Sequence, residues 1–334
     1  MKFKMSIMFL ITIILITLFG GTGIANTKSY EWTFSTIGPE NSFRHTAIMC
    51  FKENVERKTN GLVKINVFPD GILGSAKETF EALQLGGIDF QLAAASAVGT
   101  VVSQAQVLAA PCIVNNREEA YAVLEGPIGN KICALLEEKG IKVLAFADLS
   151  FVQVTNNVRP INNPDDFKGL MMRSPSALQY IETFKTLGAS VSTMPLGEVY
   201  IALSQGIMDG QFNPLDAIRA KSFYEVQDYL AIMNLFFYNT YFCMSKNLWD
   251  DLDPELQKIV KEAALEGTKA GREFSEKAYN KNIDFLKSKF KEITYPEMDP
   301  FREKVQPVYA ELDKVWGGII EETREFLKQY RMNN

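Results

Sequence analysis

The sequence predicts an α/β protein built from two similar lobes. Apolar runs typical of strands alternate with segments of helical periodicity, which favours open sheets covered by helices. The pattern Ala-Leu-x-x-Gly-x-(Ile/Met)-Asp occurs at residues 82–89 and again at 202–209. Each copy indicates a helix that stops at glycine before a short strand, and the alternative is coincidence in a common helix-stop pattern. A length of 334 residues also favours about two domains.

The first lobe is expected to begin with three strands separated by two helices. β-branched and aromatic residues mark the strands, and apolar residues at helical spacing mark the helices. The expected strands are Trp32–Ser35, Val63–Phe68 and Phe90–Ala94, and the expected helices are Thr46–Thr59 and Ala76–Leu85. Strands at Ala145–Phe146 and Val152–Thr155 are expected to connect the lobes, followed by a helix at Leu178–Leu187 that Gly188 ends.

A long helix is predicted from Pro254 to about Lys289, where apolar residues fall at helical spacing. Asp253 is its expected cap, and Pro254 suits the first turn because its fixed φ is compatible with a helix start. Gly267 and Gly271 are expected to bend this helix, because glycine has low helical propensity. Residues 302–330 are helical as well in this prediction.

The amino terminus has the pattern of a secretory signal peptide. Lys2 and Lys4 precede an apolar run from Ile7 to Phe19, and small residues follow up to Ala25. This run is shorter than the roughly 20 residues needed to span a bilayer. Cleavage after Ala25 is therefore expected, and the lack of a nearby cysteine argues against a lipid anchor. The mature chain is predicted to be soluble.

Charge and cysteine content narrow the function. Without residues 1–25 the chain keeps 33 basic and 40 acidic residues, a net charge of −7, so nucleic acid is not an expected partner. The four cysteines are far apart, without the spacing of a zinc site, and are interpreted as small buried apolar residues. Export would permit a disulfide, with Cys112 and Cys133 as the candidate pair.

The sequence offers no recognised catalytic or metal-binding constellation. His45 is the only histidine, and HExxH, GxSxG, Walker and GxGxxG motifs are absent from the sequence. Asp250, Asp251 and Asp253 lack the glycine turn and distal acid of a calcium loop, so they are interpreted as a helix entrance. We therefore expect no enzyme, no cofactor and no metal.

Arg173 is the strongest candidate for a binding residue. It ends the apolar run Leu170–Met172, which is typical of a buried strand, so its guanidinium is expected to reach partly desolvated space. A charge there requires an anionic partner. The preceding acids, Asp165 and Asp166, belong to a helix-start signal. The partner is either a ligand carboxylate, which a planar guanidinium can hold with two hydrogen bonds, or a distant acid of the fold.

Three ordered motifs surround this arginine. They are TNNVRPINNPDDFKGLMMRSP at 155–175, LGASVSTMPLGEVYIALSQGIMDGQFNP at 187–214 and KSFYEVQDYL at 221–230. Together they resemble the DctP-type substrate-binding proteins of tripartite ATP-independent periplasmic (TRAP) transporters. Weaker similarity at 56–90 and 247–264 extends the resemblance over nearly the whole mature chain.

The resemblance implies a type II-like periplasmic binding protein: two α/β lobes with a cleft between them, crossover strands and a long helix along both lobes. The implied domains are a signal peptide at 1–25, lobe 1 at 26–150 plus 239–278, and lobe 2 at 151–238 plus 279–334. It further implies a periplasmic monomer or homodimer that captures a small carboxylate. The receptor would deliver this ligand to TRAP membrane permease subunits for gradient-driven uptake.

The resemblance also implies site residues. Arg173 matches the family arginine that holds the ligand carboxylate, and Asn213 matches an asparagine that donates to the same group. Thr36 and Ser96 fall where lobe 1 usually lines the cleft, and Phe151 lies at the crossover. Phe212 is expected either to line the cleft, together with Phe236 and Phe237, or to belong to the core.

Three positions at which this sequence differs from the family's sialic-acid-binding branch indicate which ligand it binds. That branch has a second arginine where this chain has Val152, an acid near Ala94 or Ala95, and a glutamate where this chain has Phe212. A polyhydroxylated acid would lose hydrogen bonds here, so we expect a monocarboxylate. A C4-dicarboxylate is second, with Arg44 or another lobe 1 cation for its second carboxylate. The alternatives are a receptor that presents its ligand to a sensor kinase and a periplasmic enzyme acting on an organic acid.

Overall fold

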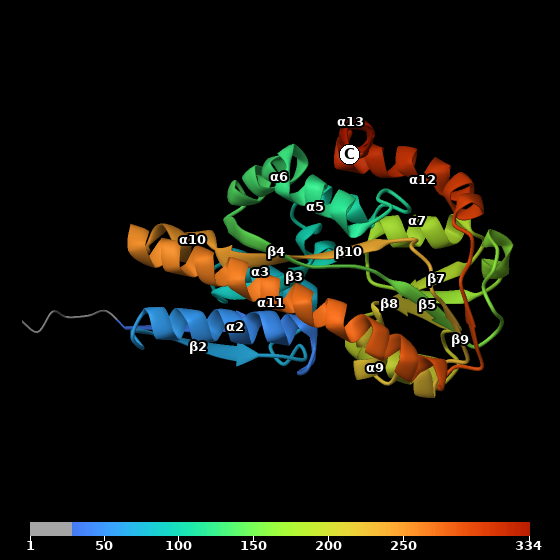
Figure 1. Cartoon of the computed structure of the whole chain (residues 1–334), viewed down its shortest axis with the longest axis horizontal. Coiled ribbons are helices and arrows are strands. Elements are labelled where there is room, and N and C mark those ends of the chain that lie inside the picture. The colour runs from blue at the N-terminus through green and yellow to red at the C-terminus, as the bar shows by residue number, and fades with distance from the viewer. Residues whose placement is uncertain (1–28) are drawn as a thin grey trace, which may run out of the picture. The chain divides into compact units, whose positions relative to one another are not determined.

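A computed structural model describes residues 29–334, apart from the side chains of residues 148 and 149. The predicted signal peptide therefore lies outside the described residues. Residues Glu31–Asn334 form one compact unit that contains two sheets and numerous helices (Figure 1). The predicted α/β class and its two sheets are confirmed. The predicted lobe limits stay a prediction, and "lobe 1" and "lobe 2" denote below the parts built on the first and second sheet.

The first sheet has the strand order β2-β1-β3-β10-β4. Its strands are β1 (Tyr30–Ser35), β2 (Val63–Phe68), β3 (Phe90–Ala94), β4 (Ile141–Phe151) and β10 (Phe237–Ser245). β1 and β3 are parallel, whereas β10 runs antiparallel to both β3 and β4. β10 completes this sheet although it follows most of lobe 2 in the sequence, so the chain crosses between the lobes as expected.

The second sheet has the strand order β11-β9-β5-β8-β6-β7. Its strands are β5 (Gln153–Asn156), β6 (Met171–Ser174), β7 (Ser190–Thr193), β8 (Gly210–Asn213), β9 (Tyr229–Ala231) and β11 (Glu292–Thr294). β6 is parallel to β7 and β8, and β5 is antiparallel to β8 and β9. The chain enters this sheet from β4 through Val152 alone and leaves it between β9 and β10.

Helices cover both sheets. The α-helices are α2 (Phe43–Lys58), α3 (Ala76–Gln84), α4 (Ala95–Val98), α5 (Arg117–Glu125), α6 (Pro127–Glu137), α7 (Leu178–Thr186), α8 (Val199–Ser204), α9 (Leu215–Ala220), α10 (Lys246–Asp250), α11 (Pro254–Lys287), α12 (Asp299–Trp316) and α13 (Ile319–Asn333). Short 3₁₀ helices are η1 (Ser103–Ala109), η2 (Pro164–Phe167), η3 (Leu196–Glu198) and η4 (Phe223–Glu225). No described helix is long and apolar enough to cross a membrane, and the four cysteines are free thiols.

The long helix α11 contacts parts of both lobes. It packs against α2 and β4 of lobe 1 and against α9 of lobe 2 (Figure 1). Gly267 lies where the two helices approach most closely, since a Cβ there would stand 2.5 Å from the carbonyl oxygen of Ala47. A Cβ at Gly271 would stand 3.0 Å from the carbonyl oxygen of Phe43. The two glycines therefore allow α11 and α2 to pack closely, and the bend predicted at these positions stays a prediction.

The repeated sequence pattern folds into the same unit twice. α3 ends before Gly86 and α8 before Gly206, and both glycines adopt positive φ, 78° and 67°. The carboxylate of Asp89 then accepts a hydrogen bond from the N–H of Thr33 at 2.7 Å. Asp209 accepts one from the N–H of Met171, also at 2.7 Å. Each aspartate ties the start of one strand to the neighbouring parallel strand, so the repeat is structural and not coincidental.

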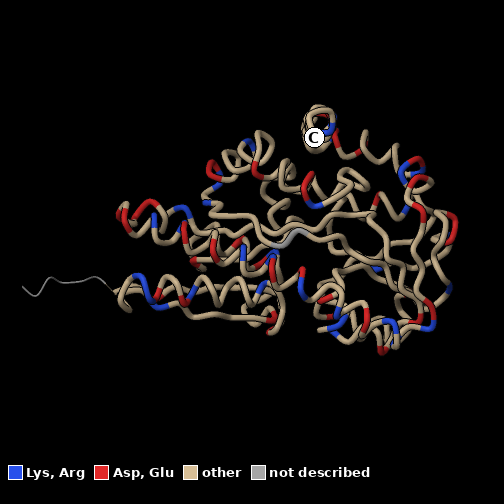
Figure 2. The backbone as a smooth tube through the Cα atoms, viewed as in Figure 1, with Lys and Arg blue, Asp and Glu red and all other residues tan. Residues whose placement is uncertain are grey.

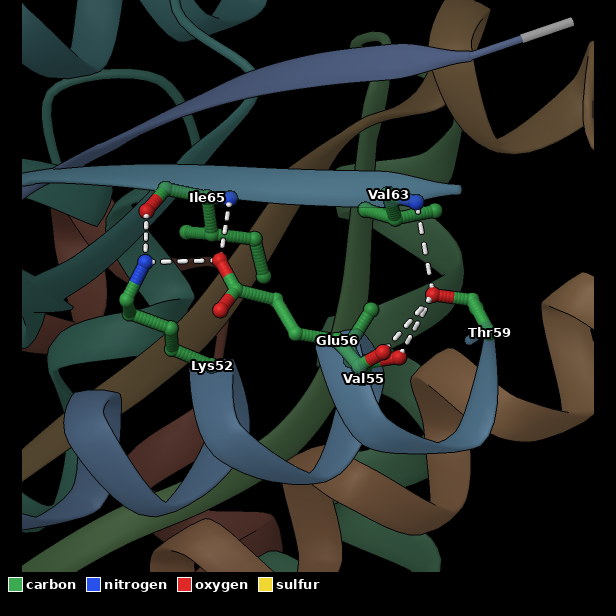
Figure 3. A network of polar contacts seen from close by, with 6 residues as sticks. All are labelled: Lys52, Val55, Glu56, Thr59, Val63 and Ile65. Atoms are coloured by element: carbon green, nitrogen blue, oxygen red, sulfur yellow. Dashed lines mark hydrogen bonds and ion pairs between the residues drawn. The ribbon is translucent and has the colours of Figure 1, made fainter. Parts of the chain in front are cut away.

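The edge strand β2 is protected by side chains of α2 (Figure 3). Lys52 donates to the carbonyl of Ile65 at 2.6 Å, and Glu56 accepts from the N–H of Ile65 at 2.9 Å. Thr59 accepts from the N–H of Val63 at 3.3 Å. Unpaired backbone groups of an edge strand invite association with other chains, and here they are occupied.

Replacing Glu56 with Gln is expected to remove a pH-dependent part of the stability. Burial raises the pKa of Glu56, but hydrogen bonds from Lys52 and the Ile65 N–H outweigh it and lower the pKa below the usual 4.5. Because the unfolded chain binds this proton more readily, the contribution is present above pH about 4.5 and is lost as pH falls through the folded pKa. Its size is roughly 0.2–1 kcal/mol, since the pair is partly exposed.

The test compares urea unfolding at pH 7 and pH 3.5 for the wild type, Glu56→Gln and the exposed control Glu53→Gln on the same helix. Glu56→Gln should lose more stability relative to the wild type at pH 7 than at pH 3.5, because the lowered pKa makes the contribution fall as the carboxylate is protonated. A loss of equal size at both pH values would show that the charge of Glu56 is not responsible.

Candidate functional site

A cavity of about 730 Å³ lies between the two lobes. Lobe 1 contributes the loop after β2, the start of α3 and the end of β3, and lobe 2 contributes the ends of β6, β7 and β8. The cavity thus lies at the carboxyl ends of parallel strands, where open α/β sheets usually bind ligands. No group of three or more potential metal ligands occurs among the described residues.

Arg173 of β6 is a buried cation on the wall of this cavity. Its side chain is 4% exposed, and its Nε and Nη2 donate to the carbonyl of Met194 at 3.1 and 2.7 Å. Among the described residues no carboxylate lies within ion-pair distance of it. Burial lowers the pKa of Arg173 to about 10, and nearby phenols and Glu198 only partly oppose this. The guanidinium stays charged at neutral pH, and none of the described carboxylates pairs with it.

Asn213 and Phe212 of β8 also line the cavity. The Nδ2 of Asn213 donates to Oε1 of Gln211 at 2.6 Å. Phe212 is 3% exposed and packs against the rings of Tyr180 and Phe236, with centroids 4.8 and 5.5 Å away. Both expectations for Phe212 therefore hold in part, because it belongs to the core and presents one edge to the cavity.

The other predicted site residues separate into two groups. Ser96 lines the cavity, whereas Thr36 is fully buried and its hydroxyl accepts from the N–H of Gly38. Phe151 lines a second cavity of about 450 Å³, while Val152 lines the first. Adjacent residues of an extended segment face opposite sides, so Val152 and not Phe151 lines the cavity of Arg173, and a ligand-binding role of Phe151 stays a prediction. Thr36 supports the loop and does not line the cavity.

Arg44 lies behind the cavity wall and does not line it. Its Nη2 donates to the hydroxyl of Tyr238 at 2.9 Å, and Tyr238 is the residue that lines the cavity. Burial raises the pKa of the neighbouring Asp216, while the charge of Arg44 and the N–H of Phe43 oppose that rise. Arg44 is therefore engaged within the protein, so the suggestion that it serves a second carboxylate was wrong. No pattern in the sequence around Tyr238 pointed to the cavity.

An ion pair joins the two lobes across the cavity. Lys221 of lobe 2 and Asp70 of lobe 1 are 2.7 Å apart, and both line the cavity. Asp70 has a positive φ of 57°, a conformation that aspartate tolerates better than most residues. The pair is partly exposed and bridges the two lobes beside the cavity.

Lys221→Met is expected to weaken ligand binding by roughly two- to fivefold, since partly exposed ion pairs contribute about 0.2–1 kcal/mol. The loss should appear as faster ligand release, because the pair bridges the two lobes that line the cavity. Lys291→Met is the matched control, since Lys291 forms a 2.7 Å pair with Asp228 within lobe 2. Equal release rates for Lys221→Met and the wild type would contradict a closing role.

Charges elsewhere do not replace this local cation. Acidic and basic residues are interspersed along the outer helices (Figure 2), and the chain as a whole is acidic. A long-range field of this sign does not attract anions. Any affinity for an anion must therefore come from groups within the cavity. Arg173 is the buried cation among the residues that line it.

Comparisons with known proteins agree with this arrangement. The sequence model of the DctP family, described as "Bacterial extracellular solute-binding protein, family 7", matches residues 34–315. A solute-binding protein of Verminephrobacter eiseniae is 32% identical over 83% of this chain and 83% of its own. The C4-dicarboxylate-binding periplasmic protein DctP of Rhodobacter capsulatus is 32% identical over 78% of this chain and 80% of its own.

Solved structures of TRAP periplasmic solute-binding proteins have the same fold. One from Sulfitobacter with bound β-D-galacturonate has a TM-score of 0.86 at 27% identity, covering 90% of this chain and 99% of its own. One from Polaromonas bound to D-erythronate has a TM-score of 0.85 at 27% identity, covering 89% and 98%. One from Bordetella, with ligand density interpreted as pantoate, has a TM-score of 0.84 at 28% identity, covering 89% and 99%.

The family match, the relatives and the shared two-lobed fold lead to one conclusion about the class of protein. This chain belongs to the DctP family of bacterial extracellular solute-binding proteins, which act as non-enzymatic periplasmic receptors for organic acids and work with the membrane permease subunits of TRAP transporters.

Proposed function

We propose that this receptor binds a small monocarboxylate between its lobes and delivers it to a TRAP permease. The observation that carries this proposal is the buried guanidinium of Arg173 in the cavity wall, which has no carboxylate partner in the part of the chain that the structure describes. A buried charge without a counter-ion is unfavourable, and a carboxylate ligand would supply the missing anion. Charge-assisted hydrogen bonds of this kind contribute roughly 1.5–3 kcal/mol each.

The rest of the cavity wall supports a ligand with one carboxylate and a largely apolar remainder. Ile37, Ala94, Val152, Leu196 and Phe212 all line the cavity. The three similar receptors described above hold β-D-galacturonate, D-erythronate and a ligand interpreted as pantoate. Each of these acids has a single carboxylate. Pantoate carries two methyl groups on its carbon chain beside its hydroxyls and is the closest of the three to what this wall would favour.

A C4-dicarboxylate is the second candidate, and Lys77 is the observation in its favour. Lys77 lines the cavity from lobe 1, and its only ion pair is a loose one with Glu81 at 3.8 Å among the described residues. A mobile lysine of this kind could meet a second carboxylate. Lys221 of lobe 2 also lines the cavity, but it is already paired with Asp70.

In the proposed mechanism the ligand first meets Arg173 and Asn213 on lobe 2. Lobe 1 then closes over it with Ser96 and Tyr238, and the pair between Asp70 and Lys221 forms. Closure excludes water, which strengthens the contact between guanidinium and carboxylate. The permease would recognise the closed form, and uptake is favoured here over presentation to a sensor kinase because the family works with permeases.

The test is a thermal-shift screen of residues 26–334 against monocarboxylates, C4-dicarboxylates, sugar acids, amino acids and aromatic acids. A ligand with micromolar affinity, about 8 kcal/mol, should raise the melting temperature when it is in large excess. We expect shifts from monocarboxylates. The protein is also unfolded, dialysed and refolded before a second screen, so that a retained ligand does not mask binding. A shift from dicarboxylates alone would reverse the order of the two candidates.

A further inference from the structure

A chain of buried polar side chains leads from the cavity into lobe 2. Asn213 at the cavity donates to Gln211 at 2.6 Å, Gln211 donates to Thr155 at 2.8 Å, and Thr155 donates to Gln227 at 2.8 Å. Gln211 and Thr155 are fully buried, and Gln227 is 3% exposed. The sheet itself sets this order, because Thr155 and Gln211 are directly opposed on β5 and β8 and Asn213 is two residues further on the same face.

The direction of every hydrogen bond in this chain is fixed at its inner end. The Nε2 of Gln227 faces two backbone carbonyls, of Val226 at 3.0 Å and Asp209 at 3.3 Å. Carbonyls only accept, so the amide nitrogen of Gln227 must point to them and its Oε1 to Thr155. The hydroxyl of Thr155 therefore donates to Gln227 and accepts from Gln211.

The same reasoning fixes the amide of Asn213. Since Gln211 gives its nitrogen to Thr155, its Oε1 must accept from the Nδ2 of Asn213. One N–H of Asn213 is thus used inside the protein, while its Oδ1 has no hydrogen-bond partner among the described residues. Rotating the amide by 180° would place two oxygens against each other at 2.6 Å. Asn213 therefore presents to the cavity an acceptor, Oδ1, beside its second N–H donor.

We infer that Gln211, Thr155 and Gln227 are positioning residues that make the receptor select 2-hydroxy acids over 2-oxo acids. This inference rests on the proposed binding of a monocarboxylate by Arg173. With the carboxylate on Arg173 and on the second N–H of Asn213, a 2-hydroxyl can donate to Oδ1 of Asn213, whereas a 2-oxo group can only accept and would oppose that oxygen. A site built to hydrogen-bond a hydroxyl discriminates strongly against an analogue that lacks it.

The experiment measures dissociation constants by calorimetry for two matched pairs: 2-hydroxybutanoate, as separate enantiomers, against 2-oxobutanoate, and pantoate against its 2-oxo analogue. We expect the wild type to bind the better hydroxy enantiomer at least tenfold more tightly than the oxo acid. In Thr155→Val the chain is interrupted, the amide of Asn213 is free to rotate, and the preference should fall below threefold. Thr155→Ser keeps the hydroxyl and should keep the preference.

The selectivity ratio separates positioning from a merely structural role, because general loosening of lobe 2 would weaken both acids together. Gln227→Met removes the inner end of the chain and should have the same effect as Thr155→Val. A wild-type ratio below threefold, or an unchanged ratio in a folded Thr155→Val or Gln227→Met, overturns the inference and leaves the proposed monocarboxylate function standing. Failure of all monocarboxylates to bind the wild type would instead remove the proposed function itself.

Discussion

Arg173→Ala is expected to weaken carboxylate binding by at least tenfold without lowering the stability of the unliganded protein. The affinity falls because the substitution removes the buried cation, which no described carboxylate pairs with. A single lost charge-assisted hydrogen bond of about 1.5–3 kcal/mol corresponds to roughly ten- to hundredfold. The stability should stay equal or rise, because an uncompensated buried charge is unfavourable in the empty receptor.

Calorimetry gives the affinity, and urea unfolding without ligand gives the stability. Arg159→Ala is the matched control, because Arg159 is also on lobe 2 and also donates to a backbone carbonyl, that of Lys168 at 3.1 Å, but does not line the cavity. Unchanged affinity in Arg173→Ala would remove the central proposal. A large loss of stability would show that Arg173 holds the loop of Met194 in place more than it serves a ligand.

The second large effect is expected from Gly267 at the crossing of α11 and α2. Alanine is the better helix former by about 1 kcal/mol, so an isolated helix would gain from Gly267→Ala. Here the added Cβ would stand 2.5 Å from the carbonyl oxygen of Ala47 and 3.3 Å from Cβ of Phe51. A backbone oxygen cannot move away as a flexible side chain can, so the helices must separate. Overpacking of this kind usually costs roughly 1–3 kcal/mol, and Gly267→Val should cost more.

Urea unfolding measures the change. Gly197→Ala serves as the control, since a Cβ at Gly197 meets nothing within 4 Å and should change the free energy of unfolding by less than about 1 kcal/mol. If Gly267→Ala were as stable as the wild type, α11 and α2 would be able to accommodate the added Cβ, and the prediction would be wrong. Because α11 also packs against α9 of lobe 2, ligand affinity should be measured in the same variant.

Much of the fold could be predicted because local patterns decided it. Val63–Phe68 and Phe90–Ala94 were predicted with the observed limits, and the helix after Ser75 starts at the predicted residue with a complete capping box. α2 begins three residues earlier than predicted, at Phe43, because the side chain of Ser42 accepts from the N–H of His45 and caps the helix. That signal was present in the sequence and was missed.

The parts of the site that the sequence did not reveal depend on contacts between distant residues. Lys221 and Asp70 lie 151 positions apart, and Thr155 and Gln227 lie 72 apart. Thr155, Lys221 and Gln227 lie within motifs, but no motif indicates how these residues pair, since the folded sheets alone bring them together. Arg173 and Asn213 could be found because each lies in the last two residues of a strand within a recognisable motif. The role of Gly267 could not be predicted, because the close packing of α11 against α2 depends on the residues of both helices.

The two aspartates of the internal repeat stabilise one end of strands whose other end lines the ligand cavity. Asp89 and Asp209 hold the first residues of β3 and β8 to the neighbouring strands, while the opposite ends of these strands reach the cavity at Ala94 and Asn213. Mutations at the cavity ends can therefore change which acid is recognised without releasing the clamps at the far ends. A receptor built in this way can acquire new ligands over evolution while each lobe keeps its architecture.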